Sequence, residues 1–150
     1  MGRGDLRWDC DKKGCFNKLK RPKWGVFADC FSRNSTFGDI DAVIDNKGER
    51  FLFVEWKCAE RTDVDVGQSL LFKGLTRLSP LIVVVIVFGD AETMDVSGIR
   101  VVSHGCVGGL ERIDLEGLKN RLRDWWANGL VGSERQAYER QRSSRSEQRR

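Results

Sequence analysis

Residues 37–57 have the sequence FGDIDAVIDNKGERFLFVEWK, and this stretch decides the fold. From Asp39 to Asp45, one side of the pattern holds Ile40, Ala42 and Ile44 and the other holds Asp39, Asp41 and Val43, which is typical of a β-strand with one buried face. Asn46-Lys47-Gly48 then supplies the residues of a tight turn, and a mostly apolar run follows from Phe51 to Lys57. The stretch therefore predicts a β-hairpin whose second strand ends in charged residues.

The region after the hairpin predicts a helix followed by a buried strand. Over Val66–Leu78, four leucines fall on one side of a helix, and we expect that side to pack inward. These residues are Leu70, Leu71, Leu75 and Leu78. Pro80 ends the helix. The run Leu81–Phe88 is rich in Val and Ile, which favours a central strand.

Three further elements complete the expected order. They are a short amphipathic helix from Pro22 to Phe31, a short strand over Ile99–Ser103, and a last helix from Asp114 to Asn128 that Gly129 ends. The last helix is expected to turn apolar residues inward, namely Leu115, Leu118, Leu122 and either Trp125 or Trp126.

This order predicts an α/β fold with a central mixed β-sheet of about four strands, flanked by helices. We expect a single domain over residues 1–132, of which residues 1–22 form a basic irregular arm. Residues 133–150 contain too few apolar residues to fold by themselves, and they are expected to form a basic, disordered tail.

Charge and apolar content limit the class of protein. The 26 Lys and Arg residues exceed the 22 Asp and Glu residues, and the net charge of +4 favours polyanionic partners such as DNA. The longest apolar run, Leu81–Phe88, is shorter than the roughly 20 residues that cross a bilayer. We therefore expect a cytoplasmic protein without a membrane partner, whose five cysteines are reduced thiols.

Acid-x-Lys triplets occur three times, and only one has an unusual context. Asp11/Lys13 lies in the basic arm and Asp45/Lys47 in the hairpin turn, whereas Glu55/Lys57 ends an apolar strand. Residues two apart on a strand share a face, so Glu55 and Lys57 point to one side where the strand is still half buried. Burying two charges without a purpose is costly. The pair is therefore a candidate for chemistry.

The preceding strand brings further carboxylates towards this pair. Asp39 and Asp41 also lie two apart, and the hairpin turn is expected to place their face beside Glu55. Three carboxylates so close repel one another unless a cation lies between them, and hard oxygen ligands suit Mg²⁺ or Mn²⁺. The hairpin therefore predicts a site for Mg²⁺ (or Mn²⁺) that could hydrolyse phosphodiester bonds.

The stretch FGDIDAVIDNKGERFLFVEWK resembles the core of the PD-(D/E)XK nuclease superfamily, especially its small phage-type and Holliday-junction-resolvase-like members. The resemblance covers residues 37–57 and implies a restriction-endonuclease-like core. It implies a Mg²⁺-dependent deoxyribonuclease, an endonuclease rather than an exonuclease, in the cytoplasm of a bacterium or a phage-infected host.

The same resemblance assigns roles to single residues. Asp41, Glu55 and the main-chain carbonyl of Trp56 would hold the metal, and Lys57 would position the attacking water. Asp39 is the competing first acid; with Asp41 as the ligand, Asp39 would support a second metal or contact solvent. Gln68, followed by Phe72, resembles a Gln-x-x-x-aromatic element that lies beside the metal in some relatives, so Gln68 joins the candidate catalytic residues. The first helix lacks the glutamate that many relatives place there, which puts a second metal in doubt.

Blander interpretations stay open. Asp41, Glu55 and Lys57 could form a cross-strand salt bridge on an exposed hairpin, which stabilises little. A non-catalytic nucleic-acid-binding module on the same fold is the alternative function. A zinc-stabilised interaction protein is the third, with Zn²⁺ held by Cys10, Cys15, His104 and Cys106, although this spacing and the lone histidine weigh against zinc.

The basic arm suggests contacts with DNA. Lys20, Arg21 and Lys23 could contact phosphates without regard to base sequence, although a solvated arm explains them equally well. Cleavage of a branched junction would require a symmetric homodimer.

Overall fold

A computed structural model describes residues 22–31 and 37–129 of the chain. The chain divides into two units, Met1–Gly38 and Asp39–Arg150, which are considered separately here. Whether both belong to one domain, as expected, stays a prediction. The expected tail and nearly all of the expected arm lie outside the described residues. Within the described part, the structure holds no helix with the length and hydrophobicity that a membrane crossing requires.

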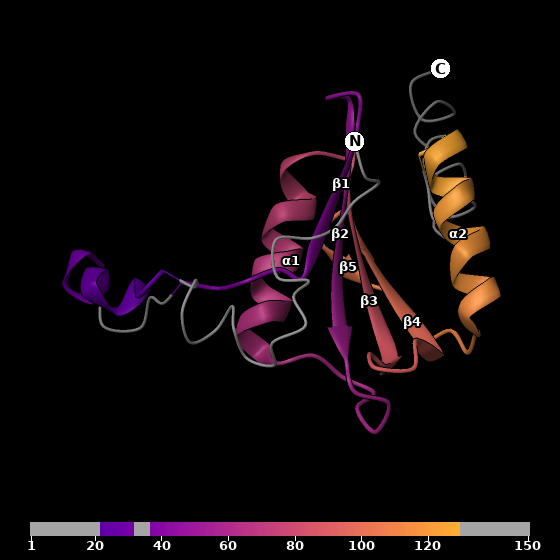
Figure 1. Cartoon of the computed structure of the whole chain (residues 1–150). Helices are drawn as coiled ribbons and strands as arrows, with labels where there is room; N and C mark the ends of the chain where they lie inside the picture. The colour runs from indigo at the N-terminus through magenta and orange to yellow at the C-terminus, as the bar shows by residue number, and fades with distance from the viewer. Residues whose placement is uncertain (1–21, 32–36, 130–150) are drawn as a thin grey trace, which may run out of the picture. The chain divides into compact units, whose positions relative to one another are not determined.

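The second unit is built on a five-stranded sheet with the strand order β1-β2-β3-β4-β5 (Figure 1). β1 pairs antiparallel with β2, β2 pairs parallel with β3, and β3, β4 and β5 continue antiparallel, so the sheet is mixed as expected. The strands are β1 (Ala42–Asn46), β2 (Arg50–Lys57), β3 (Ile82–Asp90), β4 (Asp95–Ser103) and β5 (Cys106–Val107). The fifth strand was not expected, and β4 begins four residues earlier than the sequence predicts.

The hairpin between β1 and β2 is confirmed. Lys47 and Gly48 have φ angles of 58° and 74°, the left-handed values that such a turn needs, and the Glu49 N–H donates to the Asn46 carbonyl at 3.1 Å. The register pairs Ala42 with Val54 and Asn46 with Arg50. β1 begins at Ala42, however, and not at Asp39 as expected, because the chain bends at Asp41.

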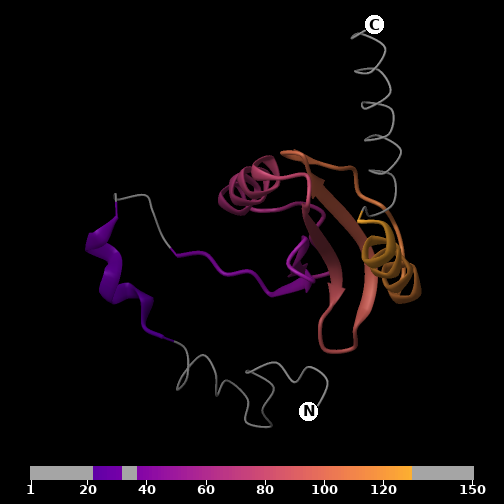
Figure 2. The same cartoon turned by 90° about the horizontal axis from the view of Figure 1, so that it is seen from above.

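Two helices cover opposite faces of this sheet, as the view from above shows (Figure 2). They are α1 (Val66–Leu78), which connects β2 to β3, and α2 (Leu115–Asn128). The bounds of α2 were predicted well, because Asp114 caps its start by accepting from the Gly117 N–H at 2.8 Å. Gly129 ends α2 with a φ of 80° and donates to the Trp125 carbonyl.

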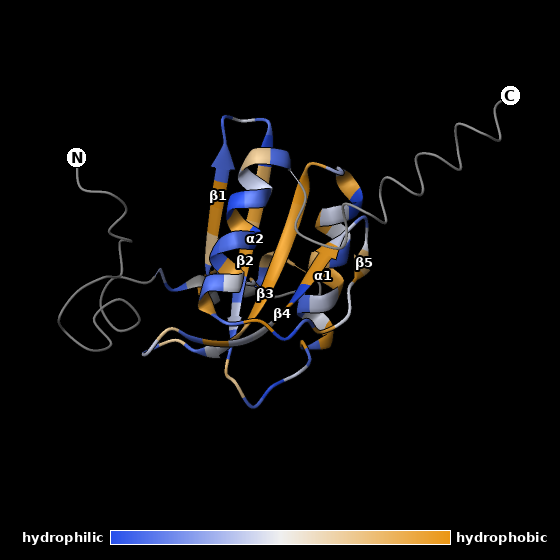
Figure 3. Ribbon diagram, turned by 90° about the vertical axis from the view of Figure 1, so that its right-hand side faces the viewer, coloured by the Kyte–Doolittle hydropathy of each residue, from blue (hydrophilic) through white to orange (hydrophobic). Residues whose placement is uncertain are grey.

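Alternate residues of the strands form two core layers. The layer beneath α2 contains the buried residues Leu52, Val83, Val85, Val87, Ile99, Val101, Leu118 and Trp125. The layer beneath α1 contains Phe72, Val84, Ile86, Phe88 and Val102. The central strands are coloured as hydrophobic, in agreement with burial on both faces, while the outward side of α2 is largely hydrophilic (Figure 3). The inward side of α2 was predicted correctly, with Trp125 buried and Trp126 49% exposed.

The inward side of α1 was predicted wrongly. Leu70 and Leu78 are 66% and 79% exposed, and the buried residues of the helix are Phe72 and Thr76. Thr76 can be buried because its hydroxyl donates to the Phe72 carbonyl and accepts the Gly105 N–H. The spacing of the leucines alone could not show that a hydrogen-bonded threonine, and not a leucine, would be buried.

In the first unit, the expected helix from Pro22 to Phe31 is a 3₁₀-helix, η2 (Trp24–Cys30). Phe27 and Phe31 each contact Phe37 edge-on, with ring centroids 6.2 and 5.4 Å apart. The aromatic residues thus contact one another, and all three are about half exposed.

Candidate active site

The expected acid-x-Lys pair lies at the carboxyl end of β2, on the face covered by α1. The register places Glu55 beside Ile86 and Lys57 beside Phe88, two residues of the α1-side core layer. Glu55 is only 5% exposed. The interpretation of this pair as part of an exposed surface salt bridge is therefore wrong for Glu55.

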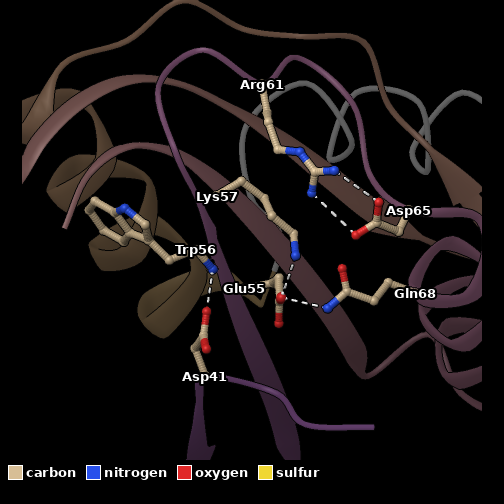
Figure 4. A network of polar contacts seen from close by, with 7 residues as sticks. All are labelled: Asp41, Glu55, Trp56, Lys57, Arg61, Asp65 and Gln68. Atoms are coloured by element: carbon tan, nitrogen blue, oxygen red, sulfur yellow. Dashed lines mark hydrogen bonds and ion pairs between the residues drawn. The ribbon is translucent and has the colours of Figure 1, made fainter. Parts of the chain in front are cut away.

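Two side chains donate to the same oxygen of Glu55. The Lys57 ammonium lies 2.8 Å from Oε1, and the Gln68 amide nitrogen lies 2.6 Å from it (Figure 4). Gln68 belongs to the first turn of α1, and the structure brings its side chain to Glu55. Glu55 Oε2 and Gln68 Oε1 are buried and find no hydrogen-bond partner among the described residues.

Asp41 reaches the same strand end by a different contact from the one expected. Its Oδ2 accepts the main-chain N–H of Trp56 at 2.6 Å, as Figure 4 shows. The β1–β2 register ends at the pair Ala42 and Val54, so the Asp41 carboxylate takes a place that a strand carbonyl would otherwise fill. The carboxylate is thereby fixed at the edge of the sheet and remains exposed.

The main-chain carbonyl of Trp56 points to the same edge. Phe51 donates its N–H to Leu81, before β3, so the odd-numbered residues of β2 direct their polar main-chain groups towards β3. The N–H and carbonyl of one residue in a strand point the same way. Both main-chain groups of Trp56 therefore point towards the β1 side of the strand, where its N–H meets Asp41.

The Trp56 side chain lies on the opposite face of the sheet and anchors the strand end. Its indole N–H donates to the Gly89 carbonyl at 3.0 Å, and its ring packs on the α2-side core. Gly89 sits at the β-bulge between β3 and β4, where a Cβ atom would lie 2.2 Å from the Asp95 carbonyl oxygen. The end of β2 is thus held from behind.

A loop between β2 and α1 borders the site and contains residues that the sequence interpretation missed. Arg61 pairs with Asp65 through two hydrogen bonds of 3.0 and 3.2 Å. The Arg61 guanidinium, by hydrogen bonding and by its charge, holds the pKa of Asp65 below its usual range. Arg100 in β4 donates to the Thr62 carbonyl and ties the loop to the sheet. Because both residues lie in the loop before α1, no helix or strand periodicity indicated this pair.

The expected convergence of three carboxylates is not observed. Within residues 22–31 and 37–129, no three His, Cys, Asp or Glu side chains are grouped so that they could hold a metal ion. Asp39 precedes the bend and is exposed, because β1 does not extend back to it. The site as described therefore contains two fixed carboxylates, from Asp41 and Glu55, and the main-chain carbonyl of Trp56.

The zinc hypothesis keeps only part of its ligand set within the described residues. His104 and Gly105 form the β4–β5 turn with φ angles of 51° and 79°, which gives this histidine a place in the backbone turn. Cys106 follows as an exposed free thiol. Cys10 and Cys15 lie outside the described residues, so this hypothesis stays untested.

The basic residues proposed for DNA contact belong to the first unit. Lys23 precedes η2 and is exposed, whereas Lys20 and Arg21 lie outside the described residues.

The chain matches no protein-family model, no curated protein and no solved structure.

Proposed function

We propose that this chain is a metal-dependent nuclease of the PD-(D/E)XK type, with a restriction-endonuclease-like core, that hydrolyses DNA phosphodiester bonds as an endonuclease. One observation carries the proposal: Glu55 is buried at the end of an apolar strand, and one of its oxygens lacks a partner among the described residues. A lysine and a glutamine meet the other oxygen.

This arrangement is costly for a fold that does not use it. A buried acceptor without a hydrogen bond costs about 1–3 kcal/mol, and more when it is charged. An ion pair in such a place is often no better for stability than apolar residues of similar volume. Local rules are broken chiefly at functional sites, which supports a functional reason for Glu55.

The residues fit a small divalent cation that prefers oxygen. Glu55 Oε2, the Asp41 carboxylate and the Trp56 carbonyl would hold it, and Mg²⁺ commonly uses one or two carboxylates while it keeps several waters. Mn²⁺ accepts the same donors. The absence of a third carboxylate among the described residues is compatible with such a hydrated ion. When bound, the cation supplies positive charge for the phosphate oxygens and for the attacking water.

Lys57 positions the attacking water or the phosphate. Its side chain is only 12% exposed and is held by Glu55 through one of its three N–H donors. The remaining donors can hold the attacking water or a phosphate oxygen. In the reaction, a water oxygen bonds to phosphorus and that water gives up one proton to solvent, while the bond from phosphorus to the leaving oxygen breaks and the leaving oxygen takes up a proton from solvent.

DNA is the proposed partner because of the charges around the site. Arg61 lies in the loop that borders the site, where it pairs with Asp65, and its side chain is about half exposed (Figure 4). A guanidinium there can contact a phosphate on the strand that is cut. The net charge of +4, concentrated towards both ends of the chain, adds contacts that do not depend on base sequence.

A cleavage assay on the full chain tests the proposal. Purified protein is incubated with supercoiled plasmid and about 5–10 mM Mg²⁺ or Mn²⁺, a concentration high enough to fill a weak site. We expect nicking or linearisation that EDTA stops. Lys57→Ala and Glu55→Gln should lose about 10³-fold or more of the rate, because each removes a group at the reacting centre.

The matched control is Lys119→Ala, which removes one exposed lysine from α2, on the opposite face of the sheet. It should cleave like the unsubstituted chain. Full cleavage by Lys57→Ala, or full activity in excess EDTA, would reject the mechanism. Circular dichroism of each variant shows whether a lost rate reflects a lost fold.

One observation favours the alternative, a non-catalytic nucleic-acid-binding module. Asp41 already accepts a main-chain hydrogen bond, so this carboxylate also has a structural use without metal. Calorimetry separates the two functions: DNA binding without any heat from Mn²⁺ titration supports the binding module and contradicts the nuclease.

A further inference from the structure

The two oxygens of Glu55 have different surroundings, although they belong to one carboxylate. Oε1 accepts from Lys57 and from Gln68, while Oε2 is buried and has no partner in the described part of the chain. We infer that Gln68 is a positioning residue, which holds Oε1 so that Oε2 is presented to the cation. This inference rests on the proposed function and deepens it.

The geometry allows Gln68 to fix the carboxylate. Its amide nitrogen is 2.6 Å from Oε1, and it comes from α1, whereas Lys57 comes from the same strand as Glu55. Two donors from different elements on one oxygen oppose rotation of the carboxylate. α1 is itself anchored below by the buried Phe72, one turn further along the helix. Oε2 points away from both donors (Figure 4).

The orientation of the Gln68 amide also follows from chemistry. If the amide were turned over, its oxygen would face the Glu55 carboxylate, and two acceptors would repel each other. With the nitrogen on Glu55, the Gln68 oxygen is left buried without a partner within the described residues. The N–H donor of Gln68, and not its oxygen, is therefore the group that meets Glu55.

Loss of Lys57 and loss of Gln68 should therefore affect cation binding differently. Both donate to Oε1, but the lysine carries a positive charge that repels a nearby cation, and the glutamine is neutral. Loss of Gln68 removes only the orientation of Glu55. Partners that orient a metal ligand are typically worth about 10- to 100-fold in metal affinity. Loss of Lys57 removes repulsion together with orientation.

The experiment is calorimetric titration of the full chain with Mn²⁺, with no DNA present. We expect Gln68→Met to weaken Mn²⁺ binding about tenfold or more, and Lys57→Met to leave it unchanged or tighten it. Gln68→Leu serves as a second variant if Gln68→Met does not fold. Leu70→Ala, which shortens a 66% exposed side chain on the same helix, is the matched control and should bind like the unsubstituted chain.

Thermal unfolding of each variant in EDTA separates positioning from a structural role. A lower melting temperature for Gln68→Met with an unchanged Mn²⁺ affinity would mean that Gln68 only ties the helix to the strand, and it overturns this inference alone. If the unsubstituted chain binds no Mn²⁺, the proposed function fails and the inference fails with it. Weaker binding in Gln68→Met but not in Lys57→Met supports both.

Discussion

The two faces of the sheet bury different chemistry. The face under α2 buries a mostly apolar core, with Trp125 as its largest side chain, whereas the face under α1 places Glu55, Lys57 and Gln68 beside an apolar layer. The same strand serves both, since Trp56 turns to one side and its two neighbours turn to the other. Because strand side chains alternate, β2 can be held rigidly from one face while it presents a charged pair on the other.

The largest effect on stability is expected on the α2 face. Trp125 is 1% exposed, so Trp125→Ala should lower the free energy of unfolding by about 3–5 kcal/mol through the cavity that it leaves. Urea unfolding followed by circular dichroism measures this change. The neighbouring Trp126 is 49% exposed, and Trp126→Ala should cost about 1 kcal/mol or less. Equal losses for the two variants would contradict the inward assignment of Trp125.

A smaller effect of opposite sign is expected on the α1 face. In the double variant Glu55→Met/Lys57→Met, apolar side chains replace a buried pair whose carboxylate is only half satisfied among the described residues. Such replacements are often neutral or stabilise a protein by about 1–4 kcal/mol. We expect unfolding in EDTA to shift to equal or higher urea concentration, while cleavage is lost.

The single variant Glu55→Met is the matched comparison for this double change. It leaves Lys57 at 12% side-chain exposure without its carboxylate partner, so it should be clearly less stable than the double variant. If instead the double variant is the less stable of the two, the charged pair stabilises the fold. The stated contrast between the two faces would then be wrong.

The sequence predicted elements whose signals are local. The β1–β2 turn needs left-handed residues and contains Lys47-Gly48, and α2 has a capping aspartate at one end and Gly129 at the other. The buried strand β3 could be expected because its Val and Ile run is continuous. In each case, the residues that determine the element are neighbours in the chain.

The errors arose where distant contacts decide the outcome. α1 turns Phe72 and Thr76 inward, and the burial of Thr76 depends on a hydrogen bond from Gly105, far along the chain. The bend at Asp41 depends on the Trp56 N–H, which the carboxylate accepts in place of a strand carbonyl. Asp41, Glu55, Lys57 and Gln68 lie at the end of β2, but not in the expected arrangement, and their role as a site stays a prediction.

The smallest effect is expected at the exposed loop that borders the α1 face. Arg61 lowers the pKa of Asp65, so the pair contributes stability above the usual aspartate pKa, and this contribution is lost as the pH falls through the lowered value. Arg61→Ala should return the pKa of Asp65 towards its ordinary value, as carboxyl-carbon NMR titration would show. Because both side chains are about half exposed, the unfolding midpoint at neutral pH should hardly change.

Asp90 is the internal reference for this titration. Main-chain N–H groups of Thr93 and Glu92 lower the pKa of Asp90, and Arg61→Ala should leave that pKa unaltered. If the pKa of Asp65 stays low in Arg61→Ala, a group other than Arg61 lowers it, and the assignment of this pKa shift to the Arg61 pair is wrong.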